Sequence, residues 1–296
     1  MAAFALASSS GSAPAFEPGA HIPYLAGSAG GVPIGVVPPP GWYLSSLTTY
    51  VQGTFHADIQ PKQPMGLSLF SEGLTLLWVP EPEILGARYS AYVSQAAVVK
   101  TISNIPPRDV TRTETGLINT VISPVNLGWT LPDDFYVSGR FTFYPKDGQY
   151  SSDNLVNIAN NFWTFEPNVG ISYLKGGFDL SIHLIYDIVT ENTNTLVHGN
   201  VHGHYQSGNV FVAEYSLSQA FGPWRFGMTG YGVQQTNDDS AGGRTLHNTE
   251  LSKVGAGPLV EYNAKWIGIN LYYIRDIAWR RAFGGNNVFF KITVKF

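Results

Sequence analysis

The residues in this sequence most capable of chemistry are three histidines, His198, His202 and His204, which fall within seven positions. Imidazole nitrogens are common ligands of zinc, copper and nickel, and His202 and His204 would share one face of an extended segment. No carboxylate lies inside this cluster, however, and the surrounding segment has the composition of a loop. We therefore expect a solvated external loop here, with no metal site and no cofactor.

His183 and Asp187 are the next candidates, because an acid–base pair could serve a hydrolase. Four strand residues would separate them by about 13 Å, too far for a hydrogen bond. The sequence contains no cysteine and no nucleophile, nucleotide-binding or metalloprotease motif. Asp238 and Asp239 lack the further spaced carboxylate of a calcium loop. We therefore expect no enzymatic activity.

The composition separates this chain from ordinary soluble proteins. Charged residues make up 13% of its 296 residues, whereas soluble domains contain about 25%. Aromatic residues reach 14%, and 32 glycines and 19 prolines interrupt the chain too often for long helices. The three prolines at 38–40 exclude a membrane-spanning helix from the longest uncharged stretch, residues 22–55. The net charge of −4 gives no electrostatic footprint for nucleic acid, so we expect no nucleic-acid partner.

Alternation with a period of two residues is the strongest structural signal. Apolar side chains occupy every second position in residues 135–144, 178–187, 266–273 and 288–296. The faces between them carry mostly Ser, Thr, Gly, Asn and Tyr, which suits the lumen of a membrane barrel better than the surface of a soluble β-sandwich, the alternative fold. In the second of these stretches we expect Leu180, Ile182 and Leu184 to face lipid, and Asp179, Ser181 and His183 to face inward.

Twelve strands follow from this rule, and the lengths of their connections alternate. The connections after even-numbered strands are short, whereas those after odd-numbered strands are mostly long. Outer-membrane barrels combine short periplasmic turns with long external loops, and a soluble meander has no reason to do so. We therefore predict an all-β fold, a closed antiparallel transmembrane β-barrel of about twelve strands in the bacterial outer membrane, with the last strand paired to the first. The expected strands are residues 42–57, 66–79, 86–101, 115–129, 134–146, 161–174, 177–190, 208–220, 224–236, 250–263, 266–278 and 287–296.

Aromatic side chains gather near the expected strand ends, which is typical of the two interfacial girdles of a membrane barrel. The chain ends on Phe296, which resembles the signal that the barrel-assembly machinery recognises. We expect that machinery, outer-membrane lipid and lipopolysaccharide as partners. The clustered aromatic residues are Trp42, Tyr43, Phe135, Tyr136, Trp163, Trp224, Trp266 and Trp279.

Residues 1–41 precede the expected barrel, which occupies residues 42–296. They are rich in glycine, proline and alanine and contain few charges, and residues 1–20 resemble the end of a secretory signal. Two interpretations stay open. The segment is either a residual signal followed by a flexible periplasmic arm, or residues 21–40 enter the lumen as a small plug.

Strand parity also assigns the side chains that should line the lumen. A charge on the lipid face costs about 2–4 kcal/mol at the bilayer midplane, which places the charged residues inside. These charges either brace the interior or line a permeation path. Twelve strands enclose less space than a sixteen-stranded porin, and an aromatic wall with few polar groups suits a small apolar solute. The expected lumen residues are Tyr136, Arg140, Tyr144, Asp179, His183, Glu214, Arg225, Tyr231, Glu261, Asn270, Tyr272, Phe289 and Lys291, together with Lys295.

This lumen predicts a channel for the diffusive uptake of small apolar or aromatic compounds. The alternative is a non-conducting structural or adhesive barrel that acts through its external loops.

Several short motifs, taken in order, resemble a known family. Together they cover about residues 36–296 and are similar to the meta-pathway phenol-degradation family. The resemblance implies an outer-membrane barrel that passes aromatic or other apolar compounds, and it names no single ligand. The histidine-rich segment 198–204 departs from the family. The motifs lie at residues 35–43, 141–150, 160–167, 191–193, 230–239 and 256–258.

Overall fold

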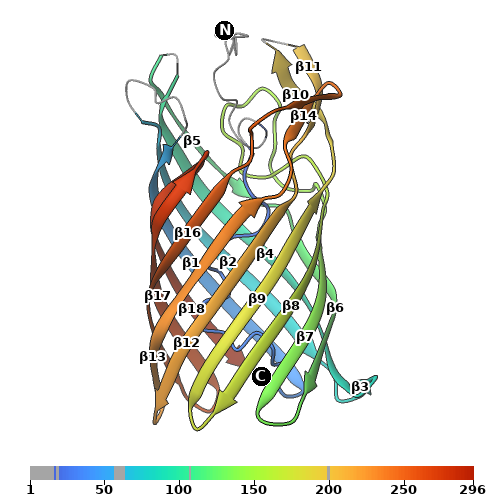
Figure 1. The fold of residues 1–296 in the computed structure, drawn as a ribbon, viewed down its shortest axis with the longest axis vertical. Coiled ribbons are helices and arrows are strands. Elements are labelled where there is room, and N and C mark those ends of the chain that lie inside the picture. The colour runs from blue at the N-terminus through green and yellow to red at the C-terminus, as the bar shows by residue number, and fades with distance from the viewer. Residues whose placement is uncertain (1–16, 18–19, 57–63, 107, 199–200) are drawn as a thin grey trace.

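A computed structural model describes most of the chain, and its strands form a closed antiparallel barrel (Figure 1). Most of the expected signal segment, residues 1–20, and the expected external loop at 57–64 lie outside the described residues. The described residues are 17, 20–56, 64–106, 108–198 and 201–296, without the side chains of residues 56 and 196–202.

Twelve strand positions make up the barrel wall, and antiparallel pairing of the first with the last strand closes it, which confirms the predicted fold. Eleven positions are each occupied by one strand. The twelfth is shared by β5 and β6, which pair with β4 one after the other. The wall strands are β1 (Gly41–His56), β2 (Gly66–Val79), β4 (Ala87–Ile105), β5 (Val110–Leu117) with β6 (Val121–Thr130), β7 (Phe135–Tyr144), β8 (Thr164–Lys175), β9 (Phe178–Val189), β12 (Val210–Phe221), β13 (Trp224–Gln235), β16 (Ser252–Asn263), β17 (Ile267–Arg280) and β18 (Ala282–Lys295).

The alternating sequence pattern becomes an alternation of exposure along each strand. In β9 the three apolar residues Leu180, Ile182 and Leu184 are 37–39% exposed, as lipid-facing side chains are in the absence of lipid. The intervening residues of this strand are only 1–3% exposed, which confirms the predicted faces. The buried residues are Asp179, Ser181 and His183.

Two predicted external loops were wrong in extent. The loop expected at 101–114 is mostly strand, because β4 and β5 continue upward as a hairpin. The loop expected at 280–286 is a tight turn, in which Arg281 has a φ of 51° and β18 begins at the next residue. The paired glycines Gly284 and Gly285 look like turn residues in the sequence but form strand ladder opposite β1.

The wall is interrupted once, between β5 and β6. The side chain of Gln95 bridges this break, since its amide donates to the carbonyl oxygen of Ile118 at 2.7 Å and accepts from the Thr120 hydroxyl at 2.7 Å. From the neighbouring loop, the amide of Gln149 donates to the carbonyl oxygen of Leu117 at 2.9 Å. Side-chain and loop hydrogen bonds therefore replace the missing part of the ladder.

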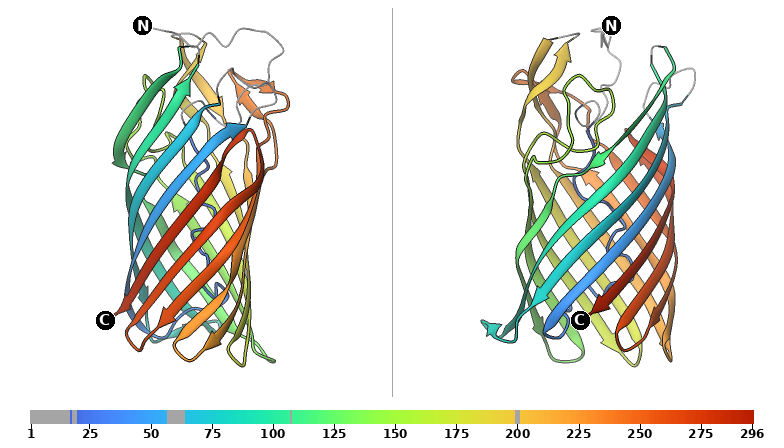
Figure 2. Two further views of the ribbon diagram at one scale, coloured as in Figure 1. Left: turned by 90° about the vertical axis from the view of Figure 1, so that its left-hand side faces the viewer. Right: turned by 180° about the vertical axis from the view of Figure 1, so that it is seen from behind.

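The external end of the barrel carries a second, small sheet (Figure 2). The three clustered histidines belong to this sheet. The side chains of His198 and His202 lie outside the described set, whereas the His204 ring lies 2.9 Å from Glu191. Among the described residues, no three His, Cys, Asp or Glu side chains are grouped as a metal site would require. The described part of the chain also has no helix long and apolar enough to span a membrane. The strands of this sheet are β10 (Asn192–His198), β11 (Val201–Gln206), β14 (Asp239–Ala241) and β15 (Arg244–Leu246), and β3 (Glu83–Ile84) lies at the opposite end.

Aromatic side chains mark the ends of the apolar belt. Trp42 and Trp78 stack with ring centroids 6.0 Å apart, and Trp224 meets Tyr262 at 4.8 Å, both near the short turns. Tyr43, expected in the same girdle, is instead buried inside the barrel, where its hydroxyl donates to a carbonyl oxygen of the preceding segment. Its position in the alternation explains the difference, since neighbours in a strand point to opposite faces.

Glu72 of β2 is a charged residue on the lipid-facing side. It shares this face with the exposed residues Phe70 and Leu74, and the hydroxyls of Ser46 and Thr48 on β1 both donate to its carboxylate. The two hydroxyls compensate part of the cost of placing a carboxylate there. Glu72 is absent from the predicted sites, because charged residues were expected to face inward.

Candidate functional site

Residues 20–40 run through the inside of the barrel, from the external loops down to the start of β1 at the end with the short turns (Figures 1 and 2). The segment folds as consecutive tight turns, whose backbone hydrogen bonds link residues 25–28, 27–30, 29–32 and 33–36 at 2.9–3.0 Å. Gly27 and Gly31 have φ values of 96° and 75°, a region that glycine adopts without strain. The glycine content of this segment therefore lets it coil within a narrow lumen.

The upper end of the segment is held by a loop above β8. The amide of His21 donates to the Asn160 side chain at 3.1 Å, and the Asn160 amide donates back to the His21 carbonyl oxygen at 2.9 Å. The His21 ring also lies 2.9 Å from the carbonyl oxygen of Ile158. Asn119 of the wall break in turn bonds the backbone of Asn160. The loop and the segment therefore fix each other.

The middle of the segment is held by polar side chains of the wall, beginning with β12. Glu214 accepts hydrogen bonds from the Tyr24 hydroxyl at 3.1 Å and from the amide of Gly27 at 2.5 Å. Two residues further along β12, Ser216 accepts from the amide of Gly31 at 2.9 Å. The wall thereby satisfies backbone donors that the irregular segment cannot pair internally.

The opposite side of the segment is bonded to β17 and β18. The carbonyl oxygen of Ser28 accepts from the Lys291 ammonium at 2.8 Å and from the Tyr272 hydroxyl at 3.2 Å. The Asn270 amide donates to the carbonyl oxygen of Gly30 at 2.9 Å. The expected lumen residues Glu214, Asn270, Tyr272 and Lys291 therefore bond the segment directly, and the His183 ring lies edge-on to Tyr24 at 6.1 Å.

The lower end of the segment is bonded to β4, β7 and β8. Ser172 accepts from the amide of Gly35 at 2.9 Å, and Ser138 donates to the carbonyl oxygen of Ile34 at 2.8 Å. The Arg88 guanidinium donates to the carbonyl oxygen of Val37 at 3.0 Å. The segment is thus hydrogen-bonded to strands on several sides of the barrel.

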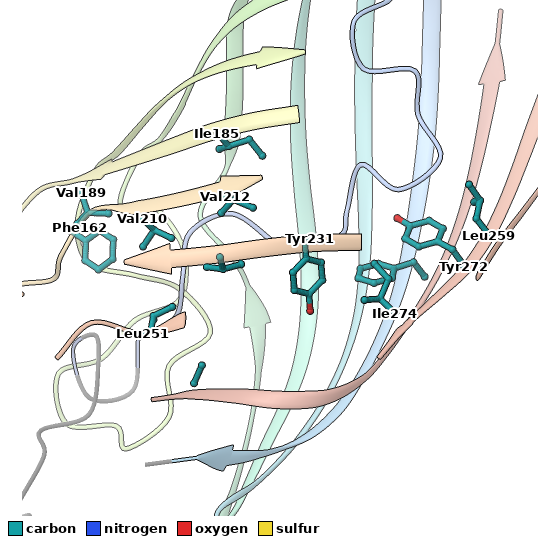
Figure 3. Close-up of a cluster of buried hydrophobic side chains, with 13 residues drawn as sticks. Phe162, Ile185, Val189, Val210, Val212, Tyr231, Leu251, Leu259, Tyr272 and Ile274 are labelled. Carbon is teal, nitrogen blue, oxygen red and sulfur yellow. The ribbon is translucent and has the colours of Figure 1, made fainter. Parts of the chain in front are cut away.

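Close packing accompanies these bonds. A Cβ at Gly30 would lie 2.6 Å from the Tyr272 ring, so only glycine fits at this position. The Tyr272 and Phe289 rings stack at 4.8 Å, and apolar residues of the segment, such as Ile22 and Ala26, pack against the same buried cluster (Figure 3). The cavity between the segment and β9, β12 and β13 has a volume of only about 10 Å³, roughly the space of one water.

Five other expected lumen residues belong to two charged groups on the inner wall. Near the short turns, Arg225 lies 3.8 Å from Asp179 and 3.7 Å from Glu261. Higher up, Tyr144 donates to Glu166, and Arg140 lies over the Tyr92 ring at 5.5 Å.

Three further expected lumen residues lie elsewhere on the inner wall. Tyr231 donates to Asp276, which the Lys253 ammonium approaches to 3.0 Å. Tyr136 is half-buried beside Gly35, and Lys295 lies over the ring of Tyr43.

Sequence reasoning missed several residues that hold the segment. Ser138, Ser172 and Ser216 obey the same strand parity as the expected residues, but the predicted lumen residues are mostly charged or aromatic. Asp276 was missed although it keeps the parity of Asn270 and Tyr272, because the bulge of β17 lies beyond it, between Asp276 and Ala278. Residues 20–40 themselves carry no charged side chain, and their contacts are made mostly by backbone groups.

Glu17 ties the segment to the external loops. Its carboxylate accepts from the Asn192 amide at 2.7 Å and from the Tyr150 hydroxyl at 2.8 Å, and its own amide donates to Ser207 at 3.3 Å. Burial raises the pKa of the Glu17 carboxyl, because no cation compensates for the lost water. Loops far apart in the sequence therefore meet on one residue.

These observations define an outer-membrane β-barrel with a segment of its own chain in the lumen. Residues 46–292 match the family described as "Putative MetA-pathway of phenol degradation", and the chain belongs to this family. No curated protein is significantly similar in sequence.

Among solved structures, the outer-membrane channel COG4313 from Pseudomonas putida F1 is similar in fold, with a TM-score of 0.78. The two sequences are 10% identical, and the alignment covers 90% of this chain and 98% of that channel. The transport unit of the autotransporter AIDA-I from Escherichia coli has a TM-score of 0.55 at 9% identity, covering 87% and 90% of the two chains. At these identities the likeness shows the fold.

Proposed function

We propose that this protein is a channel for the diffusive passage of small apolar or aromatic compounds, in which residues 20–40 act as a plug. The observation that carries the proposal is the mixed character of the inner wall, where the rings of Tyr231, Tyr272 and Phe289 lie among polar and charged side chains. The family description, which refers to phenol degradation, supports the same class of solute. The name of the similar channel supports transport and not catalysis.

The expected selectivity follows from desolvation. A sugar must give up hydrogen bonds to water that tyrosine and serine side chains replace only partly, at about 1–3 kcal/mol for each unmet group. An aromatic solute gives up little and gains ring contacts with residues such as Tyr272 and Phe289. The wall therefore favours apolar monoaromatics over polar solutes of similar size.

Flux into protein-containing vesicles tests this proposal. We expect protein-dependent passage of phenol-like solutes to exceed that of sugars of similar size by at least about tenfold, the effect of a single unmet hydrogen bond. Protein-free vesicles give the correction for passive leak of the aromatic solute through lipid. Faster protein-dependent passage of the sugars would identify a general porin instead.

A further inference from the structure

A hollow of about 460 Å³ lies at the external ends of β1, β2, β4, β17 and β18, away from the plugged lumen. Its lining includes Gln52, Ser68, Arg275, Trp279, Gly284 and Asn286. Small residues form its floor, while larger ones stand at its edge. The barrel wall is therefore indented here.

The hollow opens on the outer surface of the barrel. Gln52 pairs across strands with both Ser68 and Asn286, so these three side chains share one face. The same face of β1 carries Tyr50, which is 43% exposed, whereas the intervening Val51 is 9% exposed and points inward. The polar lining thus continues the lipid-facing surface upward.

The depth of the hollow matches the headgroup layer of the outer leaflet. Tyr50 and Tyr273 lie two residues below it on the same face, and their exposed apolar cross-strand neighbours Phe70 and Val288 continue this row. Two residues along a tilted strand rise about 5 Å, so Gln52 and Arg275 lie just beyond the aromatic girdle.

Arg275 supplies the charge of this site. It is exposed, one of its terminal nitrogens donates to the Asn286 side chain at 2.8 Å, and no salt bridge found among the described residues includes it. The Tyr273 hydroxyl bonds the same Asn286 oxygen at 2.6 Å, which fixes the orientation of the guanidinium. The remaining guanidinium donors match the geometry of a phosphate group.

Trp279 forms an aromatic edge of the site. A Cβ at Gly284 would overlap its indole, so the glycine lets the ring lie flat against the strand. The indole nitrogen is buried, so the ring offers its aromatic face and not its donor. An aromatic face beside amide and hydroxyl side chains is suited to a sugar ring.

We propose that this hollow binds the phosphorylated amino-sugar headgroup of an outer-leaflet glycolipid. Arg275 binds the phosphate, Trp279 packs against the sugar ring, and Gln52, Ser68 and Asn286 bond its hydroxyls. The acyl chains continue down over the apolar belt, which distinguishes a lipid from a free anion. The site lies outside the lumen, so it stands or falls independently of the proposed transport function.

The test is a titration of the full chain in phosphatidylcholine nanodiscs with lipid A, read by native mass spectrometry. Arg275→Gln should weaken lipid A binding at least about tenfold, the typical loss of one charge-assisted hydrogen-bond pair. The unchanged protein should bind dephosphorylated lipid A no more tightly than the Arg275→Gln variant binds lipid A. Arg112→Gln is the matched control, because this exposed arginine of β5 bonds a neighbouring backbone oxygen and does not line the hollow.

A second variant separates the hollow from the charge. Ser68→Phe keeps Arg275 but fills the floor, and it should lose lipid A binding as well. Folding of each variant is checked by heat-modifiable migration in gels. Equal lipid A affinity of Arg275→Gln and the unchanged protein, or full competition by inorganic phosphate, would overturn the proposal.

Discussion

Replacing Gly31 by valine is expected to raise the ion conductance of the reconstituted channel at least about tenfold. Gly31 has a φ of 75°, a conformation that costs a β-branched residue of order 1–3 kcal/mol. A Cβ there would also overlap the Asn270 amide and lie 2.9 Å from Leu259. Since 1.4 kcal/mol changes an equilibrium tenfold, the ratio of plugged to unplugged channels should fall at least about tenfold.

The matched control is Gly139→Val, the same chemical change on the barrel wall. Gly139 of β7 has no positive φ, and a Cβ there meets no atom within 4 Å. Its conductance in planar bilayers should equal that of the unchanged protein. If Gly31→Val is as silent as this control, residues 20–40 do not obstruct the ion path.

Replacing Ile182 by arginine is expected to destabilise the inserted barrel by about 2–4 kcal/mol, the cost of a cation at mid-depth on a lipid face. Ile182 is 39% exposed and pairs with Tyr215 and Ile171, which are also exposed. The adjacent Ser181→Ala should cost only about 1 kcal/mol, because it removes inward hydrogen bonds to Asp179 and Ser172.

Urea unfolding of both variants in lipid vesicles measures these free energies. The unchanged protein and Ile182→Val provide the reference, since the latter keeps an apolar side chain at the lipid face. Equal destabilisation by Ile182→Arg and Ser181→Ala would mean that the two faces of β9 are wrongly assigned.

The barrel could be predicted from the sequence because its determinants are local and periodic. Alternation predicted the strand count and the faces of β9, and the alternating loop lengths indicated a membrane barrel with its long loops at one end. The errors occur where local rules compete. Gly284 and Gly285, for example, look like turn residues but remain in the strand.

The path of residues 20–40 could not be predicted from the sequence, which left a periplasmic arm and a plug in the lumen as alternatives. Nothing in this segment has a period, and its contacts with Ser138, Ser172 and Ser216 use its own backbone atoms. Such contacts depend on the position of the chain in three dimensions and leave no pattern of side-chain types. The same is true of Glu72, which is tolerated on the lipid face because hydroxyls from the neighbouring strand bond it.

The direct test of a channel closed by its own N-terminal segment is the permeability of vesicles containing either the full chain or a form lacking residues 20–36. The barrel strands are intact in both, since β1 begins at Gly41. We expect the shortened form to pass small solutes at least about tenfold faster. In the full chain the contacts between the segment and the wall are worth several times the 1.4 kcal/mol that changes an equilibrium tenfold, so they keep the lumen filled; the shortened form lacks them. Equal permeability of the two folded forms would contradict the proposed role of the segment.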